Sequence, residues 1–163
     1  LKVSNTEEAI LTMSIEPVDI AGIASSVFET FRDASPRHTL VLESPDSLTG
    51  LADKDKITQV LINLLSNAFK YSPDGGEIKI RVFEDGGNAC VSVTDHGIGI
   101  PKEDLSLIFD KFHRVEDNRV HKVQGTGIGL TIVKKIMEHH KGGVKAESEE
   151  GSGSVFTFWT PKP

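Results

Sequence analysis

The sequence predicts an α/β (α+β) domain in which strands and amphipathic helices share one core. Three stretches carry apolar residues at the spacing of a core-facing helix, and others alternate apolar and polar residues as half-buried strands do. With 163 residues the chain has the size of about one domain and can bury a core of its own. These observations favour a single domain of mixed class.

The first third of the chain is expected to run strand, helix, strand and short strand. We expect a linker over 1–11, a strand over 12–16, a helix over 18–33, a strand over 38–43 and a brief extended piece before residue 53. Pro17 and Asp19 are start signals for the helix. The chain opens on Leu1 with neither an initiator Met nor a signal peptide, so we expect it to be part of a longer protein.

A helix over 53–72 (DKDKITQVLINLLSNAFKYS) is the element on which the functional argument depends. Its apolar residues recur at the helical period and form a stripe that faces the core. They are Ile57, Val60, Leu61, Leu64, Leu65, Ala68 and Phe69. Asn63, Asn67, Lys70 and Tyr71 repeat the same rhythm beside it. This second stripe is either a solvated edge or a set of ligands for a metal ion, a polyphosphate and a flat ring.

After a turn at SPDGG, two alternating runs over 77–83 and 89–94 predict a β-hairpin joined by EDGGN. The second strand is expected to have one well-buried face. Pro101 sits where a short helix can begin, and we extend that helix to Phe109. A charged loop then runs to Gln124.

The last part is expected to hold a helix over 127–141 and two strands over 144–149 and 154–160. Gly142 and Gly143 are the expected stop of the helix. His139 and His140 are interpreted as partners of the helix dipole or as solvent-facing residues, rather than as ligands. Phe158 and Trp159 are expected in the core.

Composition excludes several classes of function. No apolar run approaches the roughly 20 residues that span a membrane, so the domain is expected to be soluble and without direct membrane contact. A net charge of −6 opposes binding to a nucleic-acid backbone. Cys90 is the single cysteine, which fits a buried apolar role and a reducing, cytoplasmic compartment.

Two glycine-rich segments carry candidate binding chemistry. Gly125, Gly127 and Gly129 precede a helix, where open backbone N–H groups and the positive end of the helix dipole suit phosphate oxygens. This spacing fits neither a P-loop nor a dinucleotide-binding fingerprint. Asp95, followed by Gly97, offers a carboxylate where a backbone must approach a ligand closely, such as a purine amine, although a simple Asp-Gly turn would look the same.

The four motifs in this order decide between the interpretations. N-x-x-x-N-A-x-K-Y, then D-x-G-x-G, then the pair Phe109 and Phe112, then G-T-G-x-G-L resembles the catalytic ATP-binding domain of sensor histidine kinases. The resemblance covers nearly the whole chain from about residue 12. It implies the Bergerat fold, which is a two-layer sandwich of a mixed five-stranded sheet covered on one face by three helices, with a mobile ATP lid.

The resemblance assigns roles to the second stripe of the helix over 53–72. Asn67 would ligate Mg²⁺, and Asn63 would support the metal and the phosphates from one turn earlier. Lys70 would contact phosphate oxygens, and Tyr71 would lie along the adenine or the ribose. Asn63 is therefore counted among the catalytic residues.

The glycine-rich segments also receive roles from the resemblance. Asp95 would accept a hydrogen bond from the adenine N6 amine in a pocket shaped by Gly97, Gly99 and Ile100. The lid would span about 101–124. Its other residues are Phe109 and Phe112 as anchors, Arg114 as a catalytic contact to the γ-phosphate, and the closing segment Gly125, Thr126, Gly127, Gly129 and Leu130.

One part of the family pattern is missing. The phosphoacceptor histidine is usually followed by Glu or Asp, whereas the six histidines here are followed by Thr, Gly, Arg, Lys, His and Lys. The chain is therefore expected to bind Mg-ATP without phosphorylating itself, and 1–11 would be the end of a helical hairpin that carries the acceptor. That hairpin, a response regulator and a second copy of the full-length, possibly membrane-anchored kinase are the expected partners. An anti-sigma-type serine kinase and a nucleotide-sensing module without kinase activity are the alternatives.

Overall fold

The computed structural model describes residues 12–110 and 128–163. In chain order the elements are β1 (Glu16–Asp19), α2 (Ile20–Phe31), β2 (His38–Glu43), β3 (Thr49–Ala52), α3 (Lys54–Lys70), β4 (Gly76–Asp85), β5 (Asn88–Asp95), α4 (Lys102–Leu105), α5 (Ile128–His139), β6 (Gly143–Glu149) and β7 (Gly153–Pro161). Within these two ranges, the helices lack the length and hydropathy that a membrane-spanning helix would need.

The main sheet has five strands in the order β2-β4-β5-β7-β6. The pair β2 and β4 is parallel, and the other neighbours are antiparallel. A parallel pair needs a long crossover, and here the crossover carries α3. A separate two-stranded sheet joins β1 to β3. The predicted mixed five-stranded sheet is confirmed.

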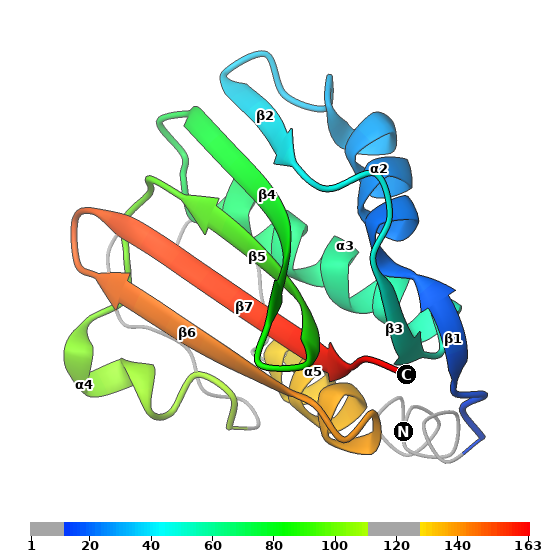
Figure 1. Ribbon diagram of the computed structural model, residues 1–163. Coiled ribbons are helices and arrows are strands. Elements are labelled where there is room, and N and C mark those ends of the chain that lie inside the picture. Colours follow the sequence, from blue (N-terminus) through cyan, green and yellow to red (C-terminus); the bar gives the residue numbers. More distant parts are fainter. Residues whose placement is uncertain (1–11, 111–127) are drawn as a thin grey trace.

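Helices α2, α3 and α5 lie together on one face of the sheet (Figure 1). The predicted apolar stripe of α3 is buried between the helices and the sheet, and Phe69 packs partly buried at its end. The sheet contributes the side chains that meet it, among them Ile78, Ile80, Val91 and Phe158. Burial of an alternating sheet face against helical stripes gives the two-layer sandwich.

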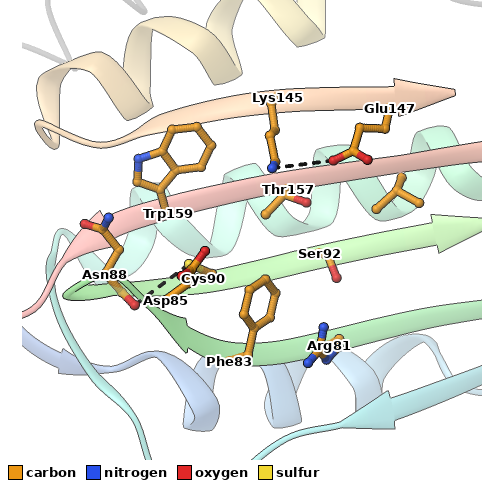
Figure 2. A pocket seen from close by; sticks show the side chains of 11 residues that line it. Arg81, Phe83, Asp85, Asn88, Cys90, Ser92, Lys145, Glu147, Thr157 and Trp159 are labelled. Carbon is orange, nitrogen blue, oxygen red and sulfur yellow. Dashed lines mark hydrogen bonds and ion pairs between the residues drawn. The ribbon is translucent and has the colours of Figure 1, made fainter.

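Strand β5 is buried on both faces, where one well-buried face had been predicted. Cys90 and Ser92 point away from the helices and are only 6% and 7% exposed. Larger side chains on neighbouring strands surround them, including Phe83 and Trp159 (Figure 2). Trp159 therefore lies half-buried on the outer face, which corrects its predicted core position, whereas Phe158 is in the core.

Three element boundaries differ from the prediction. The first strand is Glu16–Asp19 rather than 12–16, because its pairing partner β3 offers register only from Glu16, which faces Ala52. Helix α2 starts two residues later and ends two residues earlier than expected. Helix α4 ends at Leu105, and the chain continues in turns rather than in helix as far as Phe109.

Helix α5 ends on a lysine rather than on the predicted glycines. Lys141 has a φ of 59°, in the left-handed region. Its N–H donates to the carbonyl of Glu138 (3.0 Å), and the N–H of Gly142 donates to the carbonyl of Met137 (3.0 Å). This pair of bonds satisfies carbonyls that the helix end would leave open.

His140 is buried, at 3% exposed, and is neither solvent-facing nor a partner of the dipole alone. Its Nδ1 lies 2.8 Å from the carbonyl oxygen of Ile136, which can only accept, so Nδ1 carries the proton. Its Nε2 therefore accepts the backbone N–H of Asp53 at 3.1 Å. Asp53 is the N-cap of α3, so this neutral histidine ties the end of α5 to the start of α3.

Candidate functional site

Helix α3 presents its polar stripe beside the buried one, as predicted. Asn63 and Asn67 are half-buried, Lys70 is exposed, and Tyr71 is the half-buried C-cap residue. The helix starts where it does because the Asp53 carboxylate accepts the N–H of Lys56 at 3.1 Å. Cap and stripe together fix which way the two carboxamides face.

Asp95 ends β5 with its carboxylate only 5% exposed. Burial raises the pKa of Asp95, while hydrogen bonds from the backbone N–H groups of Gly97 and Ser154 act in the opposite direction. The N–H of Gly97 donates to Oδ1 at 2.9 Å, so the predicted Asp-Gly turn is present. A buried carboxylate in such a turn is also a strong acceptor for a ligand donor.

The loop after Asp95 is packed backbone against backbone. The N–H of Ile98 donates to the carbonyl of Tyr71 (3.0 Å), and the carbonyl of Ile98 accepts from Gly151 (2.7 Å). A Cβ at Gly97 would overlap the carbonyl of Tyr71. Gly99 has a φ of 70°, and a Cβ there would overlap the carbonyl of Glu149. Only glycine fits these two positions.

The polar stripe also meets the start of α5. The Nδ2 of Asn63 donates to the carbonyl of Gly129 at 3.3 Å, and a Cβ on Gly129 would lie 2.8 Å from Oδ1 of Asn63. Leu130, the next residue, packs partly buried against the core. The structure thus brings the carboxamide stripe and the last predicted glycine together.

The segment after α4 is anchored to the sheet and to α5. The ring of Phe109 packs edge-on against Phe156, with centroids 6.3 Å apart. The Thr131 hydroxyl donates to the carbonyl of Phe109 at 3.0 Å. The predicted residues Phe112, Arg114, Gly125, Thr126 and Gly127 lie outside the described residues.

Sequence reasoning missed the part of the site that β6 and β7 supply. The Ser148 hydroxyl oxygen accepts the N–H of Ile100 at 2.7 Å and donates to the carbonyl of Gly153 at 2.8 Å. Its proton is then committed, so the Ser154 hydroxyl donates to it at 2.8 Å. These serines support the loop that holds Gly99 and Ile100. No spacing in the sequence indicates them, since their partners are 48 or fewer positions away on other strands.

A hollow of about 370 Å³ lies on the other side of the sheet (Figure 2). It is lined by outward-pointing side chains of β4, β5, β6 and β7, and includes none of the predicted site residues. Its charges are paired locally: Lys145 contacts Glu147 at 3.4 Å, and the guanidinium of Arg81 lies 4.5 Å from the centre of the Phe83 ring. The candidate site is therefore at the end of α3 and β5, and this hollow is separate from it.

Known proteins share both the sequence and the fold. Residues 52–163, more than half of the chain, match the family described as histidine kinase-, DNA gyrase B- and HSP90-like ATPase. Sensor histidine kinase WalK of Bacillus subtilis is 39% identical over 165 residues, which cover 99% of this chain and 27% of that protein. Sensor-like histidine kinase SenX3 of Mycolicibacterium smegmatis is 33% identical and covers 99% and 43%. The chain thus spans less than half the length of these relatives.

The fold comparison gives the same family. The catalytic domain of histidine kinase ThkA, in a nucleotide-free form, superposes with a TM-score of 0.79 at 32% identity, covering 92% of this chain and 97% of that one. Sequence and fold therefore agree over the region that holds the polar stripe, Asp95 and Gly129. The chain belongs to the histidine kinase-, DNA gyrase B- and HSP90-like ATPase family, and within it is the catalytic ATP-binding domain of a sensor histidine kinase.

Proposed function

We propose that this domain binds Mg-ATP at the end of α3 and transfers the γ-phosphate to a histidine on a helical hairpin outside this chain. One observation carries the proposal: α3 is bonded to both glycine segments. The carbonyl of Tyr71 accepts from Ile98, and Asn63 donates to Gly129. The helix thus links a base-sized acceptor site to a phosphate-type helix start.

The residues present fit a Mg²⁺ ion bound together with a nucleotide. Magnesium prefers oxygen ligands and is commonly held by few protein groups plus phosphate oxygens. Asn63 and Asn67 place two carboxamides one helical turn apart beside the core stripe. Gly129 leaves open the space next to Asn63 that a Cβ would fill. We assign Asn67 as the metal ligand and Asn63 as its support.

The adenine is assigned to the Asp95 side. Asp95 would accept from the N6 amine, and Tyr71 would lie along the adenine or the ribose. Gly97 and Gly99 keep this wall of the site thin, because a side chain at either would displace backbone. Ile100, held by Ser148, would contribute an apolar contact.

The phosphates are assigned to the other end. Phosphoryl transfer depends mainly on positioning and charge neutralisation, which Lys70, Arg114 and the bound metal would supply. Phe109 would anchor a lid whose other members are Phe112, Gly125, Thr126 and Gly127. Leu130 would hold the start of α5 in place behind them.

The partners follow from the reaction. The acceptor would be the kinase's own dimerisation hairpin, preceding this domain, and the phosphoryl group would pass to a response regulator. We propose a homodimeric full-length kinase with this domain in the cytoplasm.

The first test measures Mg-ATP binding to this chain. Asn67→Ala should weaken binding more than about tenfold, since loss of groups at metal sites costs 10–100-fold in affinity. Asn88→Ala is the matched control, because Asn88 lies at the opposite end of β5. Equal affinity of Asn67→Ala and wild type would contradict the assigned metal ligand.

The second test identifies the acceptor. The parent kinase, extended upstream through the hairpin, is incubated with γ-labelled ATP and Mg²⁺. An acid-labile, base-stable label is expected, as for phosphohistidine. An acid-stable label would favour a serine kinase of the anti-sigma type, and tight binding without any label would favour a nucleotide-sensing module.

A further inference from the structure

His38, at the start of β2, makes a set of contacts that the ATP-binding proposal does not use. Its Nε2 lies 2.8 Å from the carbonyl oxygen of Ser72 and 3.0 Å from the Ser72 hydroxyl oxygen. Because a carbonyl only accepts, Nε2 carries a proton. Its Nδ1 lies 2.7 Å from the hydroxyl oxygen of Ser35, which donates to it when the ring is neutral.

The contact point, Ser72, lies immediately after α3. Ser72 is 2% exposed, and its hydroxyl donates to the carbonyl of Ala68 in the last turn of that helix. Its carbonyl also accepts the N–H of Gly75 at 3.0 Å. A side chain that holds Ser72 therefore holds the end of α3 against the first strand of the sheet.

The neighbouring carbonyl faces the candidate site. Tyr71 caps α3, and its carbonyl accepts the N–H of Ile98 in the loop after Asp95. Two successive carbonyls thus divide the work: Tyr71 supports the Asp95 loop, and Ser72 is held by His38. A shift at Ser72 moves Tyr71 and displaces Ile98, because the carbonyl of Tyr71 already fills the space beside Gly97.

We propose that His38 is a positioning residue for ATP binding. By fixing Ser72, it sets the positions of Lys70 and Tyr71 and of the Asp95 loop, although it does not touch the nucleotide. This inference rests on the proposed function, and deepens it by adding a residue of the first strand to the machinery of the site.

A packing role alone is the competing explanation. The ring of His38 meets Phe69 edge-on, with centroids 5.1 Å apart. His38→Phe keeps an aromatic ring at this position but removes the donor to Ser72. His38→Gln gives up the ring and keeps an N–H donor at similar reach. The two substitutions therefore separate the hydrogen bond from the packing.

The test is ATP binding by calorimetry on the 163-residue chain, far below the melting temperature of each variant. The dissociation constant should rise about tenfold in His38→Phe, and His38→Gln should recover most of that loss. In the nucleotide-free protein, the amide NMR signals of Gly97 and Ile98 should shift in His38→Phe. A packing role would leave these signals and the affinity unchanged.

Ser35→Ala is the matched control, since it removes the bond to Nδ1 and leaves the bond to Ser72. It should bind ATP within about twofold of wild type. Wild-type affinity in His38→Phe, or no recovery in His38→Gln, would overturn the role of His38. Failure of the unmodified chain to bind ATP would instead overturn the proposed function, so the two failures are distinguishable.

Discussion

Lys141 holds a backbone conformation that residues with a Cβ rarely adopt. Its φ of 59° lets the turn after α5 close, with the N–H groups of Lys141 and Gly142 satisfying the carbonyls of Glu138 and Met137. Glycine is the usual residue at this position of a helix end. The sequence places its two glycines one and two residues too late for that role.

Lys141→Gly should raise the free energy of unfolding by about 0.5–1 kcal/mol. Relief of left-handed strain is worth roughly 1–2 kcal/mol, and the greater freedom of glycine in the unfolded chain offsets part of it. Urea denaturation measures the change as a higher midpoint at unchanged slope. Lys141→Ala removes the same charge but keeps the strain, so an equal gain in that control would refute the explanation.

At the scale of the element, α3 is held at both ends by histidines from distant segments. His140 accepts the N–H of Asp53 at the start of the helix, and His38 holds Ser72 just after its end. Burial raises the pKa of Asp53, but N–H donors from Ser14, Lys56 and Asp55 outweigh it, so the net pKa is lowered. The helix that bears the carboxamides is therefore fixed in position and register.

Gly129→Ala tests the contact between α3 and α5. A Cβ 2.8 Å from Oδ1 of Asn63 would displace the carboxamide, so Mg-ATP affinity should fall about tenfold, with stability changed by less than about 1 kcal/mol. Calorimetry and thermal melting measure the two effects. Gly22→Ala, in α2, places a methyl in a helix that carries no predicted site residue, and should leave the affinity unchanged. If both variants bind ATP as the unmodified chain does, the assigned contact is wrong.

Local spacing predicted α3, its two stripes, the β4–β5 hairpin and the mixed sheet, because each depends on residues close together in sequence. The roles of His140 and Trp159 could not be predicted that way. His140 meets Asp53 across 87 positions, and Trp159 faces outward because of the register of β7 on β5. The same holds for His38 and Ser72, which are 34 positions apart. The end of α4 at Leu105 has no local stop signal either, so the prediction extended it too far.

At the scale of the whole molecule, two buried groups tie folding to pH in opposite senses. Burial lowers the pKa of His140, against the effect of its bond to Ile136, and burial raises the pKa of Asp95. The contribution of His140 to stability is present above its unfolded pKa and is lost as the pH falls toward the lowered value. That of Asp95 is present below its unfolded pKa and is lost as the pH rises through the raised value.

The free energy of unfolding should therefore fall as the pH drops from about 7.5 to about 5.5, an interval around the ordinary histidine value of about 6.5. The part due to His140 should approach at most about 1.4 kcal/mol per pH unit, the slope for one proton. Urea denaturation at several pH values measures it. His140→Gln cannot take up a proton and keeps the other histidines, so its curve should be flatter, and parallel curves would show that His140 is not the titrating group.

The turn between β4 and β5 has a practical consequence. Gly86 and Gly87, with φ of 57° and 82°, form it, and a Cβ on either would meet nothing within 4 Å. Asp95 lies at the other end of the same strand. A fluorophore attached at this turn would report on rotation of the whole domain without perturbing the nucleotide, so that movement of the catalytic unit during signalling could be followed in an active enzyme.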